Sequence, residues 1–251
     1  MSRAIYFGVD LHGHVNPSLG LIKKLVEHGE EVIYYSSKEF RDKIEQTGAE
    51  FRSYNGMLGF GVYEGKGIDA FLIYVDFILE KSQKLINHFQ DEVFDLKPDY
   101  IIHDAACYWG KELAKILGIP GISVFSSFAF VDAMIDIDAD FFVENILNAS
   151  DIPIFKRYKV KTDISRRLLI TLSRSIEAKY GLKEVKVIDD VLCSKEKLNI
   201  VFNSKGFQIY PQAFDSSYLF SGFSIYERDE KLDFPTHLLD GKPLIYISFG
   251  T

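Results

Sequence analysis

Short apolar runs alternate with segments of helical periodicity along this 251-residue chain, and this alternation limits the possible folds more than any other feature. Such runs, rich in β-branched and aromatic residues, are typical of strands. We expect strands at 4–9, 31–36, 49–54, 100–103, 121–125, 198–202 and 218–220. Apolar residues at helical spacing predict helices from Asn16 to Gly29 and at 38–47, 68–96, 109–117, 128–147, 163–179 and 185–192. The long 68–96 stretch is compatible with one helix or with two. This order indicates an α/β fold with a parallel sheet and helices on both faces.

The last 25 residues differ from this pattern. Residues 227–242 are charged, contain Pro235 and Gly241 and lack a clear period, which is typical of a linker. They leave residues 1–226 as one α/β domain. Residues 243–251 then read as a buried strand that enters a tight turn. Because a lone strand has nothing to pair with, we expect it to open a second domain, and we expect this chain to hold half of an active site.

Composition narrows the class of protein. The chain is 47% hydrophobic and 26% charged, with a net charge of −7 and a pI of about 5.4. An acidic chain without a basic run does not favour nucleic-acid binding, since phosphate contacts need clustered Lys and Arg. Two cysteines do not form a disulfide framework and fit a reducing, cytoplasmic location. No run approaches the ~20 apolar residues of a membrane span.

The segment that follows the first strand carries the first candidate chemistry. It reads Asp-Leu-His-Gly-His-Val-Asn-Pro over residues 10–17, and Asn16 and Pro17 are typical of a helix start. Ligands of open parallel sheets bind at the carboxyl ends of the strands. The sequence at residues 10–17 does not match the Gly-x-Gly-x-x-Gly pattern of dinucleotide-binding sites. A histidine here can act as a base near neutral pH if a carboxylate holds it.

Asp104, at the end of the strand predicted at 100–103, is the best candidate for that carboxylate. The expected pair is His14 with Asp104, in which histidine takes a proton from a hydroxyl and aspartate stabilises the imidazolium. His12 and His103 compete for the same role, and Asp104 could instead serve as a helix cap. His12 and His14 lack a third ligand at a recognisable spacing, so no metal site is predicted.

Aromatic residues fall near the same edge of the predicted sheet. Many of them are expected to be core, but some can line an apolar pocket. The candidates for binding an acceptor are Phe71, Phe77, Tyr108, Trp109 and Phe128.

Several motifs together resemble one family. Gly-His-Val-Asn-Pro at 13–17, the helix and strand that follow, and the segments 99–104, 220–224 and 241–251 occur in the order found in the UDP-glycosyltransferase superfamily. The resemblance covers the whole chain and is strongest to the bacterial macrolide glycosyltransferases. It implies the N-terminal domain of a two-domain GT-B enzyme, in which two Rossmann-like halves face each other across the active site.

The resemblance also implies an activity. The N-terminal half would bind a hydrophobic acceptor such as a macrolide or flavonoid, and the other half would bind a UDP-sugar, with UDP-glucose as the expected co-substrate. Transfer would be inverting and independent of metal or other cofactors. The matching residues are His14 as general base and Asp104 as its partner, with Ser248, Gly250, Thr251, Ser126 and Asn16 on the donor side.

The family's donor-binding signature is absent from these 251 residues, so we expect the chain alone to be inactive. A different class of function is an acceptor-binding or scaffolding half that needs a partner chain. A nucleotide-sugar epimerase, which can share the two-domain architecture, is the third hypothesis.

Overall fold

The computed structural model describes residues 2–59, 66–157 and 161–226, together with residues 237, 241–245 and 247. Most of the predicted linker and of the predicted strand at 243–251 therefore lies outside the described residues. The described apolar residues there, Leu244, Ile245 and Ile247, are exposed.

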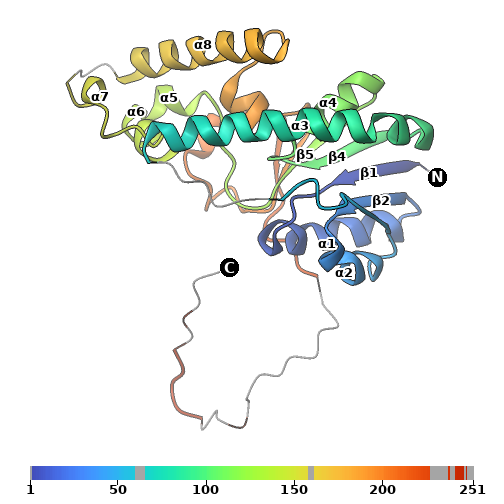
Figure 1. Ribbon diagram of the computed structural model, residues 1–251. Helices are drawn as coiled ribbons and strands as arrows, with labels where there is room; N and C mark the ends of the chain where they lie inside the picture. The colour runs from blue at the N-terminus through green and yellow to red at the C-terminus, as the bar shows by residue number, and fades with distance from the viewer. Residues whose placement is uncertain are drawn as a thin grey trace.

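Seven parallel strands form the centre of the fold (Figure 1). Their order across the sheet is β3-β2-β1-β4-β5-β6-β7. In chain order they are β1 (Arg3–Phe7), β2 (Glu31–Ser36), β3 (Glu50–Ser53), β4 (Tyr100–Asp104), β5 (Gly121–Phe125), β6 (Asn199–Val201) and β7 (Tyr218–Phe220). The register aligns Phe7 of β1 with Tyr35 of β2 and with His103 of β4. The predicted parallel sheet is confirmed, and the fold is a Rossmann-like α/β fold.

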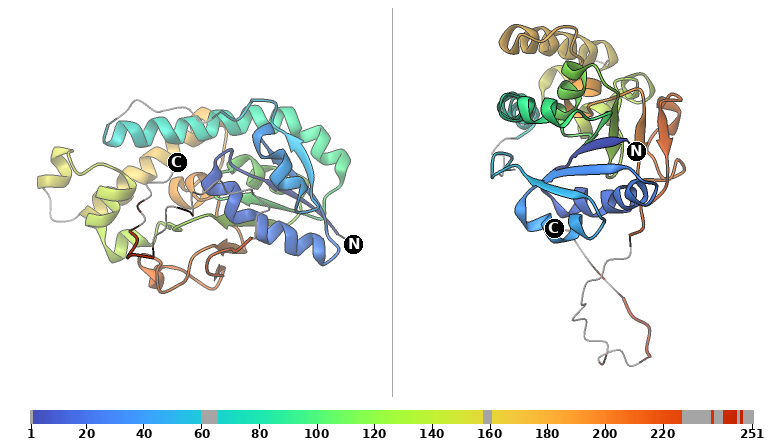
Figure 2. Two further views of the ribbon diagram at one scale, coloured as in Figure 1. Left: turned by 90° about the horizontal axis from the view of Figure 1, so that it is seen from below. Right: turned by 90° about the vertical axis from the view of Figure 1, so that its right-hand side faces the viewer.

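Helices cover both faces of this sheet (Figures 1 and 2). The α-helices are α1 (His12–Glu27), α2 (Arg41–Glu45), α3 (Ile68–Leu96), α4 (Tyr108–Leu117), α5 (Met134–Ile137), α6 (Ala139–Phe141), α7 (Pro153–Arg157) and α8 (Lys161–Tyr180). Four further turns are the 3₁₀ turns η1 (Lys38–Phe40) and η4 (Pro211–Ala213) and the π-helical turns η2 (Phe142–Ile146) and η3 (Val187–Leu192). No described helix has the length and apolar character that a membrane span requires.

The side chains of β1 alternate between the two faces of the sheet and show why helices cover both faces. Ala4 and Tyr6 pack with Val15 and Leu19 of α1 on one face, whereas Ile5 and Phe7 pack on the other face with residues of α3 and α4. Successive strand side chains point to opposite faces, so a central strand that is apolar throughout needs cover on both. A third cluster joins the first half of α3 to α5, α8 and the two π-helical turns.

The first helix corrects one prediction. Asn16 does not begin α1; the helix begins a turn earlier, at His12, and encloses Pro17. The backbone N–H groups of His14 and Val15 already donate to the carbonyl of Leu11, at 2.9 Å each. His14 therefore lies in the first helical turn and not in a loop, which fixes the direction of its side chain.

The segment predicted as one helix at 128–147 is also different. Residues 128–133 are not helical, and the remainder is divided among α5, α6 and η2. Asp138 causes one of the breaks: it is extended, with φ −151° and ψ 91°, and its side chain accepts the backbone N–H of Phe141 as a helix cap. The short helix α7 was not predicted. By contrast, α3 spans residues 68–96 with the predicted bounds, and it is one helix and not two.

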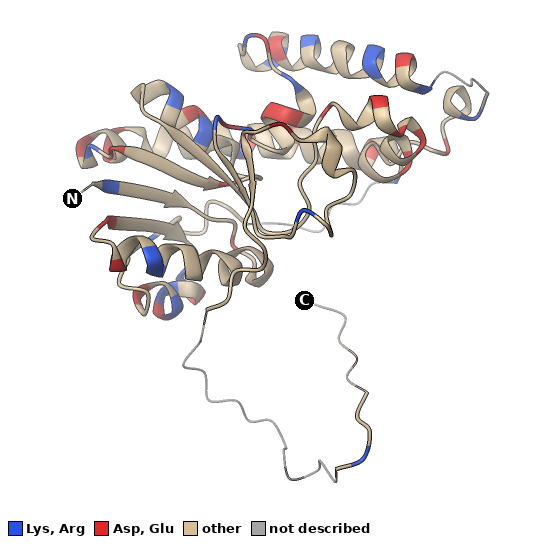
Figure 3. Ribbon diagram, turned by 180° about the vertical axis from the view of Figure 1, so that it is seen from behind, with Lys and Arg blue, Asp and Glu red and all other residues tan. Residues whose placement is uncertain are grey.

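Charged side chains lie mainly on the helices and loops, where lysines and arginines are mixed with acidic residues (Figure 3). The strands carry few of them. Both cysteines, Cys107 and Cys193, are buried as free thiols.

Candidate active site

The neighbouring strands β1 and β4 mark the point where the strand order reverses. From β1 the chain runs to β2 and β3 on one side of the sheet, and it then returns to place β4 on the other side of β1. Two crossovers leave in opposite directions from such a switch point, and ligands of open α/β sheets bind in the crevice at its carboxyl edge. The first turn of α1 and the end of β4 meet at this edge.

His14 and Asp104 are in direct contact there. His14 Nδ1 lies 2.7 Å from Asp104 Oδ2, although the residues are 90 positions apart in the sequence. The other oxygen, Oδ1, accepts the backbone N–H of Ala106 at 2.9 Å. Asp104 is thus both the partner of a histidine and the acceptor that fixes the turn before α4. Its side chain is 3% exposed and that of His14 is 30% exposed.

The electrostatics of the pair suit a base. Burial lowers the pKa of His14, but the charge of Asp104 and the hydrogen bond to it outweigh burial, and the net effect is a raised pKa. With an ionised carboxylate at Nδ1, this nitrogen carries the proton and donates it to Asp104. Nε2 is then the ring nitrogen with the free lone pair, on a side chain that solvent can reach.

Ser126 completes the group. It follows β5, the strand next to β4, and its Oγ lies 3.2 Å from His14 Nδ1. Nδ1 has one hydrogen, and the charged oxygen of Asp104 is both closer and the stronger acceptor. The hydroxyl hydrogen of Ser126 is therefore available to another acceptor. The structure brings together His14 of α1, Asp104 at the end of β4 and Ser126 after β5, at the carboxyl edge of the neighbouring strands β1, β4 and β5.

The two competing histidines have other surroundings. His12 is exposed, and its ring meets that of Phe40 edge-on at 4.9 Å. His103 is fully buried, with Nε2 3.3 Å from Glu196 Oε1. Since strand residues alternate in direction, His103 and Asp104 point to opposite faces of the sheet. Neither competitor contacts the carboxylate of Asp104.

The remaining donor-side candidates are separated. Asn16 lies on α1, half-buried, and its Oδ1 is a buried acceptor without a hydrogen-bond partner among the described residues. Ser248, Gly250 and Thr251 lie outside the described residues. Their proposed contacts with a donor remain predictions.

Phe71 lines an apolar hollow near the loop after β5, and Phe128 lies on that loop. Phe71 lines a hollow of about 360 Å³ with Tyr74, Phe130 and Ile146. Phe130 follows Ser126 by four residues, so the loop from β5 connects this hollow to the His14 group. Phe128, on the same loop, stacks on the exposed Phe207 with ring centroids 5.5 Å apart.

The other three candidates lie elsewhere. Phe77 is half-buried on α3 beneath Lys81, whose Nζ is 5.5 Å from the ring centre. Trp109 is 1% exposed and packs edge-on against Tyr54 in the core beneath α3. Tyr108 lines a separate hollow between α3 and α4. Tyr108 belongs to the same hydrophobic cluster as Phe71, and Trp109 to the cluster beneath the second half of α3, but neither lines the hollow that Phe71 lines.

Sequence reasoning missed a residue that shapes this edge. Gln208 is 4% exposed, and its Oε1 accepts the backbone N–H of Ala129 at 3.1 Å while its Nε2 donates to the carbonyl of Ala129 at 2.9 Å. Through these two hydrogen bonds the amide clamps the backbone of Ala129, in the loop between Ser126 and Phe130. No local pattern could reveal a contact across 79 positions. Among the described residues, no group of three or more His, Cys, Asp or Glu is placed to hold a metal ion.

Comparison with known proteins identifies relatives. No family model matches the chain. It is 31% identical over 256 residues to the uncharacterized UDP-glucosyltransferase YojK of Bacillus subtilis (strain 168), covering 100% of this chain and 59% of that protein. It is 30% identical over 252 residues to the NDP-glycosyltransferase YjiC of the same organism, covering 97% and 56%. It also matches the oleandomycin glycosyltransferase of Streptomyces antibioticus, at 28% identity over 123 residues, 47% of this chain and 28% of that one.

Solved structures agree on the fold. The glycotransferase of kitacinnamycin matches with a TM-score of 0.64 at 18% identity, covering 93% of this chain and 54% of that one. The calicheamicin glycosyltransferase CalG4 matches with a TM-score of 0.61 at 21% identity, covering 90% and 52%. The chain thus spans a little over half the length of these proteins. It is a homologue of bacterial UDP- and NDP-glycosyltransferases, a macrolide glycosyltransferase among them, and corresponds to their N-terminal half.

Proposed function

We propose that this chain is the acceptor-binding half of an inverting, metal-independent glycosyltransferase that moves a hexose from a UDP-sugar, with UDP-glucose as the donor, to a hydroxyl of a small hydrophobic acceptor. The observation that carries the proposal is the 2.7 Å contact between His14 Nδ1 and Asp104 Oδ2 at the carboxyl edge of the sheet. The relatives, which are named as glycosyltransferases of UDP- and NDP-sugars, support the reaction class.

The pair supplies a base for one displacement step. His14 Nε2 takes the proton of the acceptor hydroxyl while the acceptor oxygen forms a bond to the anomeric carbon of the sugar. The bond from that carbon to the diphosphate oxygen breaks, and UDP leaves with the electron pair. Asp104 stabilises the imidazolium through Nδ1 and holds the ring in the tautomer that exposes Nε2. Attack opposite the leaving group inverts the anomeric configuration.

The hollow lined by Phe71, Tyr74, Phe130 and Ile146 supports a hydrophobic acceptor. Burial of apolar acceptor surface contributes roughly 25 cal/mol per Å² to binding, and Asn145 supplies a polar group at its wall. In this proposal the free hydroxyl hydrogen of Ser126, whose Oγ lies 3.2 Å from His14 Nδ1, is donated to an oxygen of the sugar or acceptor. The donor diphosphate would be held mainly by the half of the enzyme that this chain does not contain.

The test is transfer by the full-length gene product with UDP-glucose and a panel of phenols and macrolides. We expect His14→Ala to lower turnover by about 10²–10⁴-fold on an unactivated hydroxyl. His12→Ala is the matched control, because this neighbouring histidine does not contact Asp104. Near wild-type turnover of His14→Ala, or a larger loss with His12→Ala, would show that the assignment is wrong. An acidic phenol needs little help from a base and is unsuitable as the acceptor.

A further inference from the structure

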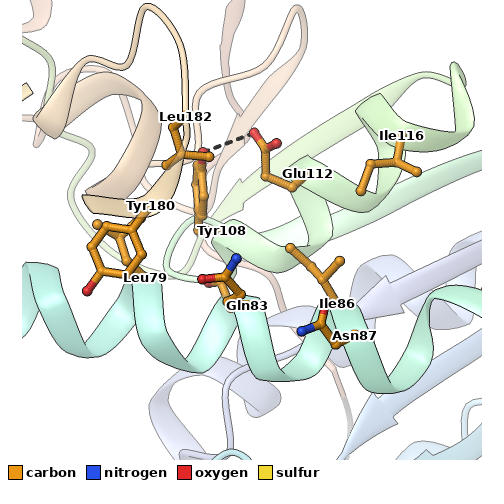
Figure 4. Close-up of a pocket in the computed structure, with 10 residues that line it drawn as sticks. Leu79, Gln83, Ile86, Asn87, Tyr108, Glu112, Ile116, Tyr180 and Leu182 are labelled. Atoms are coloured by element: carbon orange, nitrogen blue, oxygen red, sulfur yellow. Dashed lines mark hydrogen bonds between the residues drawn. The ribbon is translucent and has the colours of Figure 1, made fainter. Parts of the chain in front are cut away.

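A second hollow, of about 180 Å³, lies between α3 and α4, with Tyr180, the last residue of α8, and Leu182 at one end (Figure 4). Leu79 and Ile86 of α3 and Ile116 of α4 form apolar walls. None of its lining residues belongs to the His14, Asp104 and Ser126 group or to the hollow lined by Phe71. The proposed transfer reaction therefore gives this hollow no role.

Ser82 is the first sign of a ligand. It lines the hollow from the middle of α3, is 1% exposed, and its Oγ has no hydrogen-bond partner among the described residues. A hydroxyl inside a helix usually bonds the carbonyl four residues earlier. Thr171 and Ser175 of α8 do so, at 2.8 and 3.0 Å. Ser82 is therefore a polar residue in the wall of the hollow whose hydroxyl the described protein groups leave unsatisfied.

Glu112 is the second sign. Its side chain, on α4, is 13% exposed and accepts the hydroxyl of the buried Tyr108 at 3.0 Å (Figure 4). Its cationic neighbour is Lys115, with Nζ 3.4 and 3.5 Å from the two carboxylate oxygens. The Lys115 side chain is 68% exposed, and such an exposed pair contributes little. A carboxylate held mostly out of water therefore lacks a strong partner, and it faces the same hollow as Ser82.

Size and chemistry together define the occupant. A cavity of about 150 Å³ accepts benzene, so a hollow of about 180 Å³ fits one ring or an aliphatic body of that size. A mostly buried carboxylate favours a positive charge, and charge-assisted hydrogen bonds are roughly twice as strong as neutral ones. We propose that the α3–α4 hollow is a binding site for a small amine, whose apolar body lies against Leu79, Ile86 and Ile116 and whose ammonium group donates to Glu112.

Three probes of one shape test the role of charge: benzylamine, benzyl alcohol and toluene. Calorimetry and ¹H–¹⁵N NMR of the isotope-labelled chain give affinity and location. We expect benzylamine to bind about tenfold more tightly than benzyl alcohol, a difference of about 1.4 kcal/mol, and to shift amide signals of residues 79–87 and 108–116. Glu112→Gln keeps an acceptor for the Tyr108 hydroxyl, and it should reduce benzylamine to the affinity of benzyl alcohol. The exposed Glu80→Gln, which is outside the hollow, should change nothing.

A second pair of variants tests the location independently of charge. Gln83 is exposed at the rim of the hollow, so Gln83→Trp should block it and abolish binding of all three probes without disturbing the core. Lys84→Trp, at the next exposed position, should bind as wild type does. Equal affinity for amine and alcohol, shifts confined to residues around His14, or no saturable binding at millimolar concentration would each overturn the proposal.

Discussion

The clamp between Gln208 and Ala129 gives the sharpest test of how this edge of the sheet is built. Gln208→Ala would remove the acceptor of the Ala129 N–H and the donor to the Ala129 carbonyl, at 3.1 and 2.9 Å. Ala129 is 0% exposed, so both of its backbone groups would be left buried without a partner. Backbone groups in that position cost far more than the loss of an exposed hydrogen bond.

The size of the effect follows from these two groups. Each buried, unpaired group costs about 1–3 kcal/mol, and water entry at the site of the missing side chain offsets part of this, so we expect a loss of about 2–4 kcal/mol in the free energy of unfolding. At about 2–4 °C per kcal/mol for a domain of this size, the midpoint of thermal unfolding falls by about 4–16 °C.

Thermal and urea unfolding measure the loss, with Gln212→Ala as the control because Gln212 is exposed on the same segment. Gln208→Glu separates the two bonds. A carboxylate still accepts the N–H of Ala129, but it places a second oxygen against the carbonyl that Nε2 now donates to, so this variant should be at least as unstable as Gln208→Ala. If Gln208→Glu were as stable as the wild type, or if Gln208→Ala resembled Gln212→Ala, the clamp would not contribute as argued.

The direction of the effect can also be predicted for three further substitutions. Asp104→Asn should lower the pKa of His14 in an NMR titration, and an unchanged pKa would contradict the pairing. Because the pKa of His14 is raised in the folded state, the variant should lose most stability relative to wild type below the ordinary value of 6.5. This loss should shrink as the pH rises through the folded-state pKa. Burial raises the pKa of Asp10 to about 6, so Asp10→Asn should increase the free energy of unfolding above that pH and lose this gain toward 3.8; urea unfolding at both ends of the range decides. Gly110→Ala would place a Cβ 2.6 Å from the Cβ of His103 and should cost about 1–3 kcal/mol in the same assay, and unchanged stability would show that α4 can move.

Local patterns predicted the fold because each element is consistent with its own period. α3 could be bounded at 68–96 because Gly67 precedes it, the apolar positions repeat without a break, and Pro98 follows shortly after its end. The prediction of one helix at 128–147 was wrong for a reason that local sequence patterns do not contain. Its apolar residues are compatible with one helix, but the chain there is held by distant groups: Gln208 at Ala129, and the hydroxyl of Tyr210 at Asp138 Oδ2, at 2.5 Å.

The start of α1 shows the same limit on a smaller scale. Asn16-Pro17 is a good start signal, yet Leu11 serves as the N-cap without a side-chain bond. The earlier start matters for the candidate site, because a helical residue has a fixed side-chain direction and a loop residue does not. The family resemblance favours His14 over His12 as the partner of Asp104, and the helical geometry gives the physical reason for that preference.

The spacing of the candidate site, at positions 14, 104 and 126, follows from the strand order and not from any local motif. Asp104 ends β4, Ser126 directly follows β5, and His14 lies in the first turn of α1, the helix that follows β1. These strands are neighbours because the chain returns past β1 after β3, so an excursion of some 90 residues brings Asp104 beside His14. Insertions in that excursion would lengthen surface segments without moving the strand ends. The proposed base and its partner would therefore be held by elements of the central sheet and α1, whereas Phe71, Phe130 and Ile146, which line the neighbouring hollow, lie on α3, a loop and a π-helical turn.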